Sequence, residues 1–161
     1  MLTRRQFAGV SLGAVVSLGA LSSLTGVRTA NAAFPYSKTD AEWRKLLTPA
    51  QYRVLREEGT ERAGSSPLDH EKRAGTFHCA GCDQALFASK TKYDSGTGWP
   101  SFYAPLPGAV GTKPDPGIFG TRTEVHCSNC GGHLGHVFDD GPAPTGKRYC
   151  MNGIAMTFQA A

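Results

Sequence analysis

The sequence predicts a single, mainly β domain of short strands, preceded by two short helices. Three observations lead to this prediction. The 161 residues include 20 glycines and 10 prolines, a composition that favours turns and short strands. Helix start signals are found just before 40–58. Two Cys-x-x-Cys pairs, at 79–82 and 127–130, each suit a turn that follows a strand.

Residues 1–32 differ from the rest of the chain and are typical of an export signal. An arginine pair at 4–5 precedes an uncharged, mildly apolar run, 8–26, and the small-x-small signal at 30–32 suits cleavage. The arginine pair resembles a Tat signal, so we expect a periplasmic mature protein of residues 33–161. The alternative is an uncleaved membrane anchor, although the glycines and serines of the apolar run make it a weak one.

Cleavage would leave a nearly neutral protein. It removes three arginines and no acidic residue, so 14 lysines and arginines remain against 13 acidic residues. Nothing in this balance suggests nucleic-acid binding. We also expect no stable membrane insertion after cleavage, and a monomer.

Two helices are expected before the strands begin. Ser37 or Thr39 can cap a helix over 40–47. Thr48-Pro49 is a second start, because proline suits the first helical position, and this helix should cover 49–58 before a glycine ends it. Both helices carry apolar side chains for docking on the rest of the domain.

Strands are expected around both cysteine pairs and at the C-terminal end. The expected strands are 75–79, 85–88, 118–127, 148–152 and 154–158, the last two completing the sheet. The stretches 60–75 and 105–117 are polar or rich in proline and glycine, so we expect surface loops. A further irregular loop, 93–103, carries Trp99 and two other aromatic residues. Such residues either plug a core or line a pocket, and the loop alone favours the plug.

Four of the five cysteines form two pairs separated by 44 residues: Cys79, Cys82, Cys127 and Cys130. Four thiolates suit a tetrahedral zinc ion or, less often, an iron–sulfur centre. No further ligand is needed, so we expect a closed, structural site that joins two halves of a small sheet. A redox role for either pair is the alternative. Because Tat export carries folded proteins, the metal could be bound in the reducing cytosol before the protein meets an oxidising compartment.

The fifth cysteine, Cys150, stands alone, and such a cysteine is either a buried structural residue or a nucleophile. Residues two apart on a strand share a face, so Arg148 and Asn152 would place a cation and an amide beside the sulfur. Nearby positive charge favours the reactive thiolate. His133 and His136 lie upstream; metal binding is an alternative use for them, although four cysteines already account for a metal.

Five motifs in order resemble those of the B-type methionine sulfoxide reductases. They are Ser-Gly-Thr-Gly-Trp-Pro-Ser-Phe (95–102), His-Leu-Gly-His-Val-Phe (133–138), Asp-Gly-Pro (140–142), Thr-Gly-Lys-Arg-Tyr-Cys-Met-Asn (145–152) and the paired Cys-x-x-Cys. The resemblance covers nearly all of 39–159. It implies a small, mainly antiparallel β fold, arranged as two sheets or a distorted barrel and held together by one zinc ion, with short N-terminal helices.

The resemblance also implies a reaction and its residues. Such enzymes reduce the R epimer of methionine sulfoxide in proteins or peptides, with a thioredoxin-like or small thiol as reductant. Cys150 matches the nucleophile, which becomes a sulfenic acid. The other matching residues are His136, expected to deliver a proton, His133 near the sulfoxide oxygen, Asn152, which orders the site, Trp99, which receives the S-methyl group, and Arg148 and Phe138, expected to bind substrate. This match reverses the preference for Trp99 as a plug. The four paired cysteines match structural zinc ligands, and the implied task is repair of oxidised proteins outside the cytoplasm.

The chain departs from this family at two positions. Many relatives carry a second redox cysteine where this chain has Thr97, and that cysteine attacks the sulfenic acid. Without it, recycling must use an external thiol, a partner's cysteine or a metal-site cysteine. Gly153 stands where a serine is commoner, and we assign it no functional effect.

Two other functions fit parts of the sequence. Similar zinc-linked β folds bind ligands or partner proteins in an aromatic pocket, but a pure binder has no reason to keep Cys150 together with Asn152, His136 and Trp99. A redox sensor, in which Cys150 oxidises and signals, would lack turnover with a thiol donor.

Overall fold

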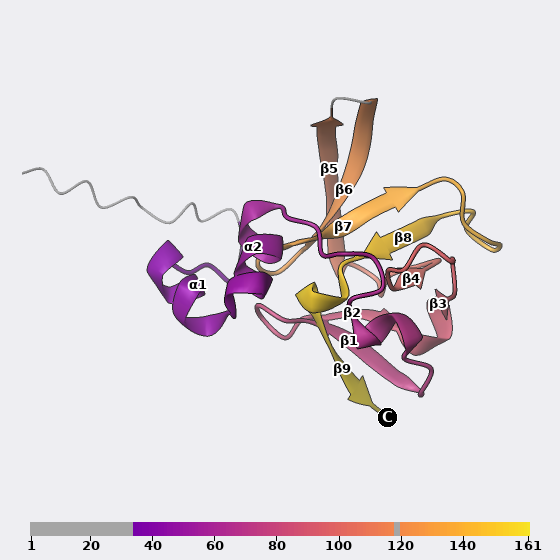
Figure 1. Cartoon of the computed structure of the whole chain (residues 1–161), viewed down its shortest axis with the longest axis horizontal. Coiled ribbons are helices and arrows are strands. Elements are labelled where there is room, and N and C mark those ends of the chain that lie inside the picture. Colours follow the sequence, from indigo (N-terminus) through magenta and orange to yellow (C-terminus); the bar gives the residue numbers. More distant parts are fainter. Residues whose placement is uncertain (1–33, 118–119) are drawn as a thin grey trace, which may run out of the picture.

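The computed structural model describes residues 34–117 and 120–161, so the predicted export signal lies outside the described residues. The described chain forms two short helices at one end of two β-sheets (Figure 1). Within these two ranges, no helix has the length and apolar character needed to span a membrane.

The two helices begin where the sequence predicts. They are α1 (Asp40–Leu46) and α2 (Pro49–Glu57). Thr39, rather than Ser37, caps α1, and Thr48 caps α2; each threonine hydroxyl accepts a hydrogen bond from the backbone N–H three residues later. In both helices the side chain of that third residue accepts a hydrogen bond from the backbone N–H of the cap threonine, which completes a capping box.

Each helix ends one residue earlier than expected. Leu47 is extended, and Glu58 has a left-handed backbone with φ 54°, a conformation common at helix ends. The buried side chains Trp43 and Leu55 join the main core. The predicted docking role of the helices is therefore confirmed.

Nine strands of the described chain form two sheets in which all paired strands are antiparallel. The smaller sheet has the order β2 (Ala85–Ala88), β1 (Gly75–Cys79), β9 (Met156–Ala160), and the larger sheet β3 (Lys92–Tyr93), β4 (Ser101–Phe102), β8 (Arg148–Met151), β7 (His133–Phe138), β6 (Gly120–Cys127), β5 (Val110–Gly117). Short 3₁₀ turns are η1 (Pro67–His70), η2 (Ser89–Thr91) and η3 (Gly153–Ala155). The two-sheet prediction is confirmed; the sheets do not close on each other, so the distorted-barrel alternative is wrong.

The last strand crosses to the other sheet, contrary to the expectation that 148–152 and 154–158 complete one sheet. After β8 the chain turns through η3, and β9 pairs with β1. The Glu61 carboxylate holds this turn, because it accepts hydrogen bonds from the backbone N–H groups of Gly153 and Ile154.

Strand β5 lies within 105–117, which was wrongly expected to be a loop because of its prolines. Pro114 and Pro116 are two apart, so both missing N–H groups fall on the same side of the strand. β5 is the edge of its sheet and pairs with β6 on one side only, where prolines are tolerated. The β5–β6 ribbon projects from the rest of the molecule (Figure 1).

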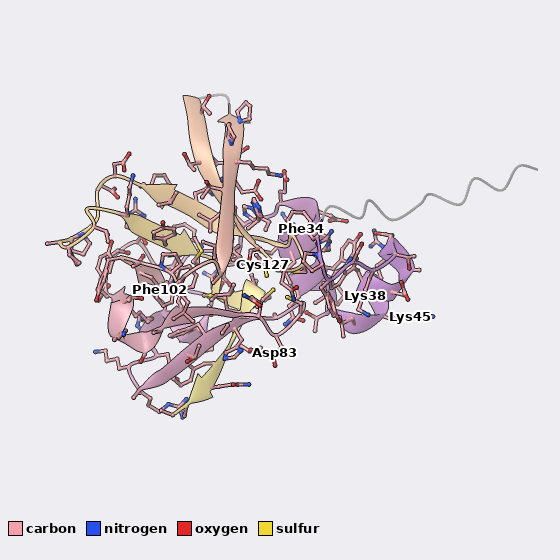
Figure 2. The ribbon with its side chains drawn as sticks, turned by 180° about the vertical axis from the view of Figure 1, so that it is seen from behind. Phe34, Lys38, Lys45, Asp83, Phe102 and Cys127 are labelled. Atoms are coloured by element: carbon pink, nitrogen blue, oxygen red, sulfur yellow. The ribbon has the colours of Figure 1, made fainter. Side chains whose placement is uncertain are left out.

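Aromatic residues dominate the core between the sheets. Phe77, Phe87 and Phe102 are fully buried, and the rings of Phe87 and Phe102 stack with centroids 4.3 Å apart. Phe102, labelled in Figure 2, belongs to the aromatic loop and plugs the core, as the loop alone predicts for its aromatic residues.

The first described residues lie on the second cysteine pair. The Phe34 ring occupies the space in which a side chain at Gly131 would stand and meets His126 edge-on, with ring centroids 5.6 Å apart. The Tyr36 N–H donates to the Asn129 carbonyl at 2.8 Å. This entry segment therefore covers one side of the cysteine turn. Phe34 and Cys127 are labelled in Figure 2.

Candidate active site and metal centre

The four paired cysteines come together as predicted. Their sulfur atoms all lie within 4.8 Å of one another; Cys79 Sγ is 3.7 Å from Cys130 Sγ, and Cys82 Sγ is 3.6 Å from Cys127 Sγ. A tetrahedral ion with metal–sulfur bonds of about 2.3 Å places its ligand sulfurs about 3.8 Å apart. The cluster therefore fits one metal ion.

The cluster also joins the two sheets. Cys79 ends β1 in the smaller sheet, and Cys127 ends β6 in the larger one. Hydrogen bonding among the sulfurs raises the pKa of Cys79 and Cys130 and lowers the pKa of Cys82 and Cys127, because a proton shared between two sulfurs stays with one of them. A bound cation would remove this need to keep protons on two of the four thiols.

Cys150 lies in the middle of the larger sheet. Cys150 belongs to β8, and its cross-strand neighbours are Ser101 of β4 on one side and His136 of β7 on the other. Burial raises the pKa of the Cys150 thiol, while Thr97, Arg148 and Ser101 oppose this shift by hydrogen bonding and charge. These neighbours favour the thiolate, which is the nucleophilic form, but burial has the larger effect and the pKa of Cys150 stays above its usual value.

His136 is held by a carboxylate from the projecting ribbon. Its Nε2 lies 2.7 Å from Oδ2 of Asp115, which also accepts a hydrogen bond from Arg122 at 2.7 Å. Burial lowers the pKa of His136, and Asp115 acts in the opposite direction. Hydrogen bonds from His136 and Arg122 hold the pKa of Asp115 below its usual value, so Asp115 remains an anion.

His133 lies behind His136 and does not line the cavity described below. Its side chain is 3% exposed, and its ring meets that of His136 edge-on, with centroids 5.4 Å apart. Nδ1 of His133 is 3.0 Å from Glu124, whose carboxylate also pairs with Lys113 at 2.9 Å. Burial alone would raise the pKa of Glu124, but Lys113 and His133 bring it below its usual value. His133 thus packs against His136 and is itself fixed by an anion.

Asn152 is buried, and both the nitrogen and the oxygen of its amide form hydrogen bonds. Its Nδ2 donates to the Leu134 carbonyl at 3.0 Å, and its Oδ1 accepts from the Glu61 N–H at 2.9 Å. The Glu61 carbonyl in turn accepts a hydrogen bond from the Trp99 indole N–H at 3.2 Å. Asn152 and Glu61 therefore fix the position of Trp99, a role consistent with the predicted ordering function of Asn152.

One cavity brings most of the predicted residues together. It has a volume of about 130 Å³, and its lining consists of Thr60, Trp99, Arg122, His136, Phe138, Cys150 and Asn152. Trp99 and Phe138 supply aromatic walls, while Cys150 and His136 supply a thiol and an imidazole. Trp99 therefore lines a pocket, while Phe102 of the same loop plugs the core. A larger cavity of about 600 Å³ lies beyond Gly153, and its lining contains neither a thiol nor an imidazole.

Arg148 lies outside this cavity. Its guanidinium donates two hydrogen bonds of 2.8 Å to Asp140 and lies over the Phe138 ring, 4.4 Å from the centroid. Of the three residues expected to share one face, Cys150 and Asn152 line the cavity, and Arg148 lines a neighbouring groove. Arg148 thus acts on Cys150 by charge and supports the Phe138 wall.

Several residues of this site were not among those predicted, including Glu61, Asp115, Arg122 and Glu124. Glu61 lies in a stretch expected to cover the surface, and Asp115 stands between two prolines of an expected loop. Neither position carries a signal that identifies it. Arg122 and Glu124 are two apart in a predicted strand, so alternation could have placed them on one face.

Comparison with known proteins agrees with this geometry. The profile of the SelR domain matches residues 47–160. The chain therefore belongs to the SelR-domain family.

Proteins similar to this chain are named peptide methionine sulfoxide reductases. The chain is 54% identical over 124 residues to the "Peptide methionine sulfoxide reductase MsrB" of Agrobacterium fabrum, an alignment covering 76% of this chain and 92% of that protein. It is 55% identical over 123 residues to the protein of the same name from Methanosarcina barkeri, covering 76% and 87%. The "Peptide methionine sulfoxide reductase B1, chloroplastic" of Arabidopsis thaliana is 53% identical over 125 residues, covering 77% of this chain and 62% of that protein.

Proposed function

We propose that this protein is an oxidoreductase that reduces methionine sulfoxide in proteins, with Cys150 as its nucleophile. One observation carries the proposal: Cys150 and His136 are cross-strand partners that line the same aromatic-walled cavity. A thiol, a proton carrier and an apolar wall are what reduction of a methyl sulfoxide requires. The names of the relatives support the same reaction.

The reaction begins with attack of the Cys150 thiolate on the sulfoxide sulfur. The oxygen accepts one proton and is transferred to Cys150, so that methionine leaves and the thiolate becomes a sulfenic acid. His136 is placed to deliver the proton, because its imidazole lines the cavity and Asp115 stabilises its protonated form. His133 and Asn152 keep the surrounding groups in position.

A fixed orientation of the substrate makes the reaction selective for one epimer, and the family resemblance implies that this is the R epimer. The S-methyl group packs against Trp99 and Phe138, and the oxygen points toward His136. With those two groups placed, only one configuration at sulfur presents the sulfur atom to Cys150.

The metal that we propose is one zinc ion held by the four paired cysteines. Four thiolates in a closed set suit structural zinc. The ion supplies cohesion between the sheets, while the chemistry belongs to Cys150. The redox alternative for these cysteines is not favoured, because all four sulfurs converge on one point.

We further propose export by the Tat route and repair of oxidised proteins in the periplasm. This part rests on the arginine pair, the apolar run and the cleavage signal within residues 1–32. A variant with Arg4 and Arg5 changed to lysine should remain in the cytoplasm, which cell fractionation would measure. Unchanged export of this variant would contradict the Tat route.

The catalytic proposal is tested with separate R and S epimers of a peptidyl methionine sulfoxide. The full chain, loaded with zinc, should reduce the R epimer alone when dithiothreitol is supplied. Cys150→Ser should lose this activity and keep its zinc. Activity retained in that variant, or reduction of the S epimer alone, would overturn the proposal.

A further inference from the structure

Cys150 is the one cysteine of this chain outside the metal cluster, so its oxidised form needs a thiol from another molecule. We propose that this thiol is a small molecule without net negative charge, which reaches Cys150 through a groove on the opposite side of β8 from the sulfoxide cavity. The proposal rests on the function proposed above, since the substrate cavity fixes where the transferred oxygen lies.

The groove is formed at the β3 side of the larger sheet. It has a volume of about 430 Å³, and its lining includes Tyr93, Asp94, Thr97, Asp140, Pro142 and Arg148. Thr97 belongs to this lining, and its Oγ1 is 3.9 Å from Cys150 Sγ. The groove therefore reaches to within one side chain of the sulfur.

Sheet order places the groove and the cavity on opposite sides of Cys150. In the order β3-β4-β8-β7-β6-β5, Cys150 of β8 has β4 on one side and β7 on the other. Tyr93 of β3 lines only the groove, while His136 of β7 and Arg122 of β6 line only the cavity. The loops cross this division, since Trp99 lines the cavity and Pro142 lines the groove. Beside Cys150 itself, Thr97 therefore lies on the groove side and His136 on the cavity side.

Reduction of a sulfenic acid requires access to the sulfur from the side opposite its oxygen. A thiolate displaces the hydroxyl at sulfur in line, so it approaches from the side opposite the S–O bond. The oxygen arrives from the substrate and therefore points into the cavity, toward His136. The in-line direction then runs toward Thr97 and the groove.

The steps balance with two thiol molecules. The first thiol forms an S–S bond with Cys150 as the S–O bond breaks, and the hydroxyl leaves as water with one added proton. A second thiol attacks this mixed disulfide, which returns Cys150 as a thiol and releases the oxidised small-molecule disulfide. Two electrons pass from the two small thiols to the sulfenic sulfur.

The lining of the groove determines the kind of thiol. Two carboxylates, Asp94 and Asp140, face one guanidinium, Arg148, which Asp140 already binds with two hydrogen bonds. The remaining negative charge disfavours an anion. The hydroxyl of Tyr93 is buried without a hydrogen-bond partner among the described residues, and it can bind a polar group of the thiol. Because Thr97 stands between the groove and the sulfur, a slender molecule suits the space.

The test measures the two half-reactions separately in the full, zinc-loaded chain. Methionine formation in a single turnover reports the first step. Decay of the Cys150 sulfenic acid after addition of cysteamine, 2-mercaptoethanol or 2-mercaptoethanesulfonate reports the second. The same acid can be made with one equivalent of hydrogen peroxide, so the thiol step is measurable even if sulfoxide reduction fails. Failure of the proposed function and failure of this inference are therefore distinct results.

Two exposed residues give matched variants on the two sides: Pro142 lines the groove, and Thr60 lines the cavity. We expect Pro142→Trp to slow the thiol step at least about tenfold and to leave methionine formation unchanged. We expect Thr60→Trp to slow methionine formation and to leave the thiol step unchanged. At equal thiolate concentration, the anionic 2-mercaptoethanesulfonate should react more slowly than 2-mercaptoethanol and cysteamine. Asp94→Asn should reduce this difference in rate. A thiol step slowed by Thr60→Trp and unaffected by Pro142→Trp would overturn the proposal, because the thiol would then use the sulfoxide cavity.

Discussion

The molecule contains two sulfur sites that are built in opposite ways. The metal cluster consists of two short motifs, each supplying a pair of ligands from one turn, and only one long-range contact is needed to complete it. The Cys150 cavity takes its residues from a loop, from β6, β7 and β8, and from the segment after α2. The comparison separates two tasks. Under the proposed function, the cluster holds the sheets together and the cavity performs the chemistry.

The largest effect that would test this division is removal of the metal. Apparent binding free energies of structural zinc are about 10–16 kcal/mol in small peptides, which is comparable with the whole stability of a small domain. We expect the metal-free chain to be largely unfolded at 25 °C. Circular dichroism and thermal unfolding after chelation under reducing conditions provide the measurement. A metal-free chain that keeps its melting temperature would show that the cluster does not hold the sheets together.

Replacing the nucleophile should give the converse result. Cys150→Ser should lower kcat/KM at least about a thousandfold, because the thiolate is removed. Its free energy of unfolding should change by no more than about 1 kcal/mol, since a serine replaces one partly buried thiol by a hydroxyl of similar size. Denaturant unfolding and zinc content should match wild type. Loss of zinc in this variant would mean that the two sites are not independent.

A smaller effect is expected from Asp115→Asn, which removes the carboxylate that holds His136. We expect kcat to fall by about ten- to a hundredfold, because His136 loses orientation and charge stabilisation. Asp115 counteracts the lowering of the His136 pKa by burial, so the variant should have a still lower His136 pKa. The proton on His136 is then lost at a lower pH, so near neutral pH a smaller fraction of the enzyme holds the Cys150 thiolate together with a protonated His136.

A pH–rate profile of both proteins measures this shift. Because burial raises the Cys150 pKa and lowers the His136 pKa, the rising limb at low pH bends at the pKa of His136 and the falling limb at high pH bends at the pKa of Cys150. The rising limb should therefore bend at a lower pH in Asp115→Asn, and the falling limb should stay in place. Asp139→Asn is the matched control, since Asp139 is exposed and pairs with Lys147 away from the cavity. A rising limb that does not move in Asp115→Asn would remove His136 from the role of proton donor.

The smallest effect concerns a part that belongs to neither sulfur site. Thr48→Ala removes the cap of α2 and should cost about 1 kcal/mol of unfolding free energy with kcat unchanged. Thr48→Ser keeps the capping hydroxyl and should retain most of that stability. Urea unfolding of the two variants gives the difference. A change in kcat would show that α2 is coupled to the cavity.

The same contrast explains what could be predicted from the sequence. The metal ligands and the helix caps depend on residues close together in the chain, so the Cys-x-x-Cys spacing identified the ligands and Thr48 the cap of α2. For α1 the sequence left Ser37 and Thr39 both possible, and the structure has Thr39. Cys150 could be identified because four cysteines paired and one did not. The two-sheet arrangement came from the family resemblance and is confirmed.

The remainder depends on contacts between distant segments. Asp115 reaches His136 only because β5 and β6 pair over their full length, and the two prolines of β5 led to the prediction of a loop there. β9 joins β1 because Glu61 holds the turn at Gly153, from 92 residues away in the chain. Arg148 faces the groove because Asp140 binds it, which strand alternation alone does not reveal.

The most direct test of the central claim is a single turnover of the reduced, zinc-loaded chain with a peptidyl methionine R-sulfoxide and no added thiol. We expect one methionine to form per chain and one oxygen atom to appear on Cys150, with the four paired cysteines unmodified and the zinc retained. Mass spectrometry of the trapped peptides identifies the oxidised residue. Oxygen on a paired cysteine, or zinc released with each methionine formed, would contradict the separation of the two sites.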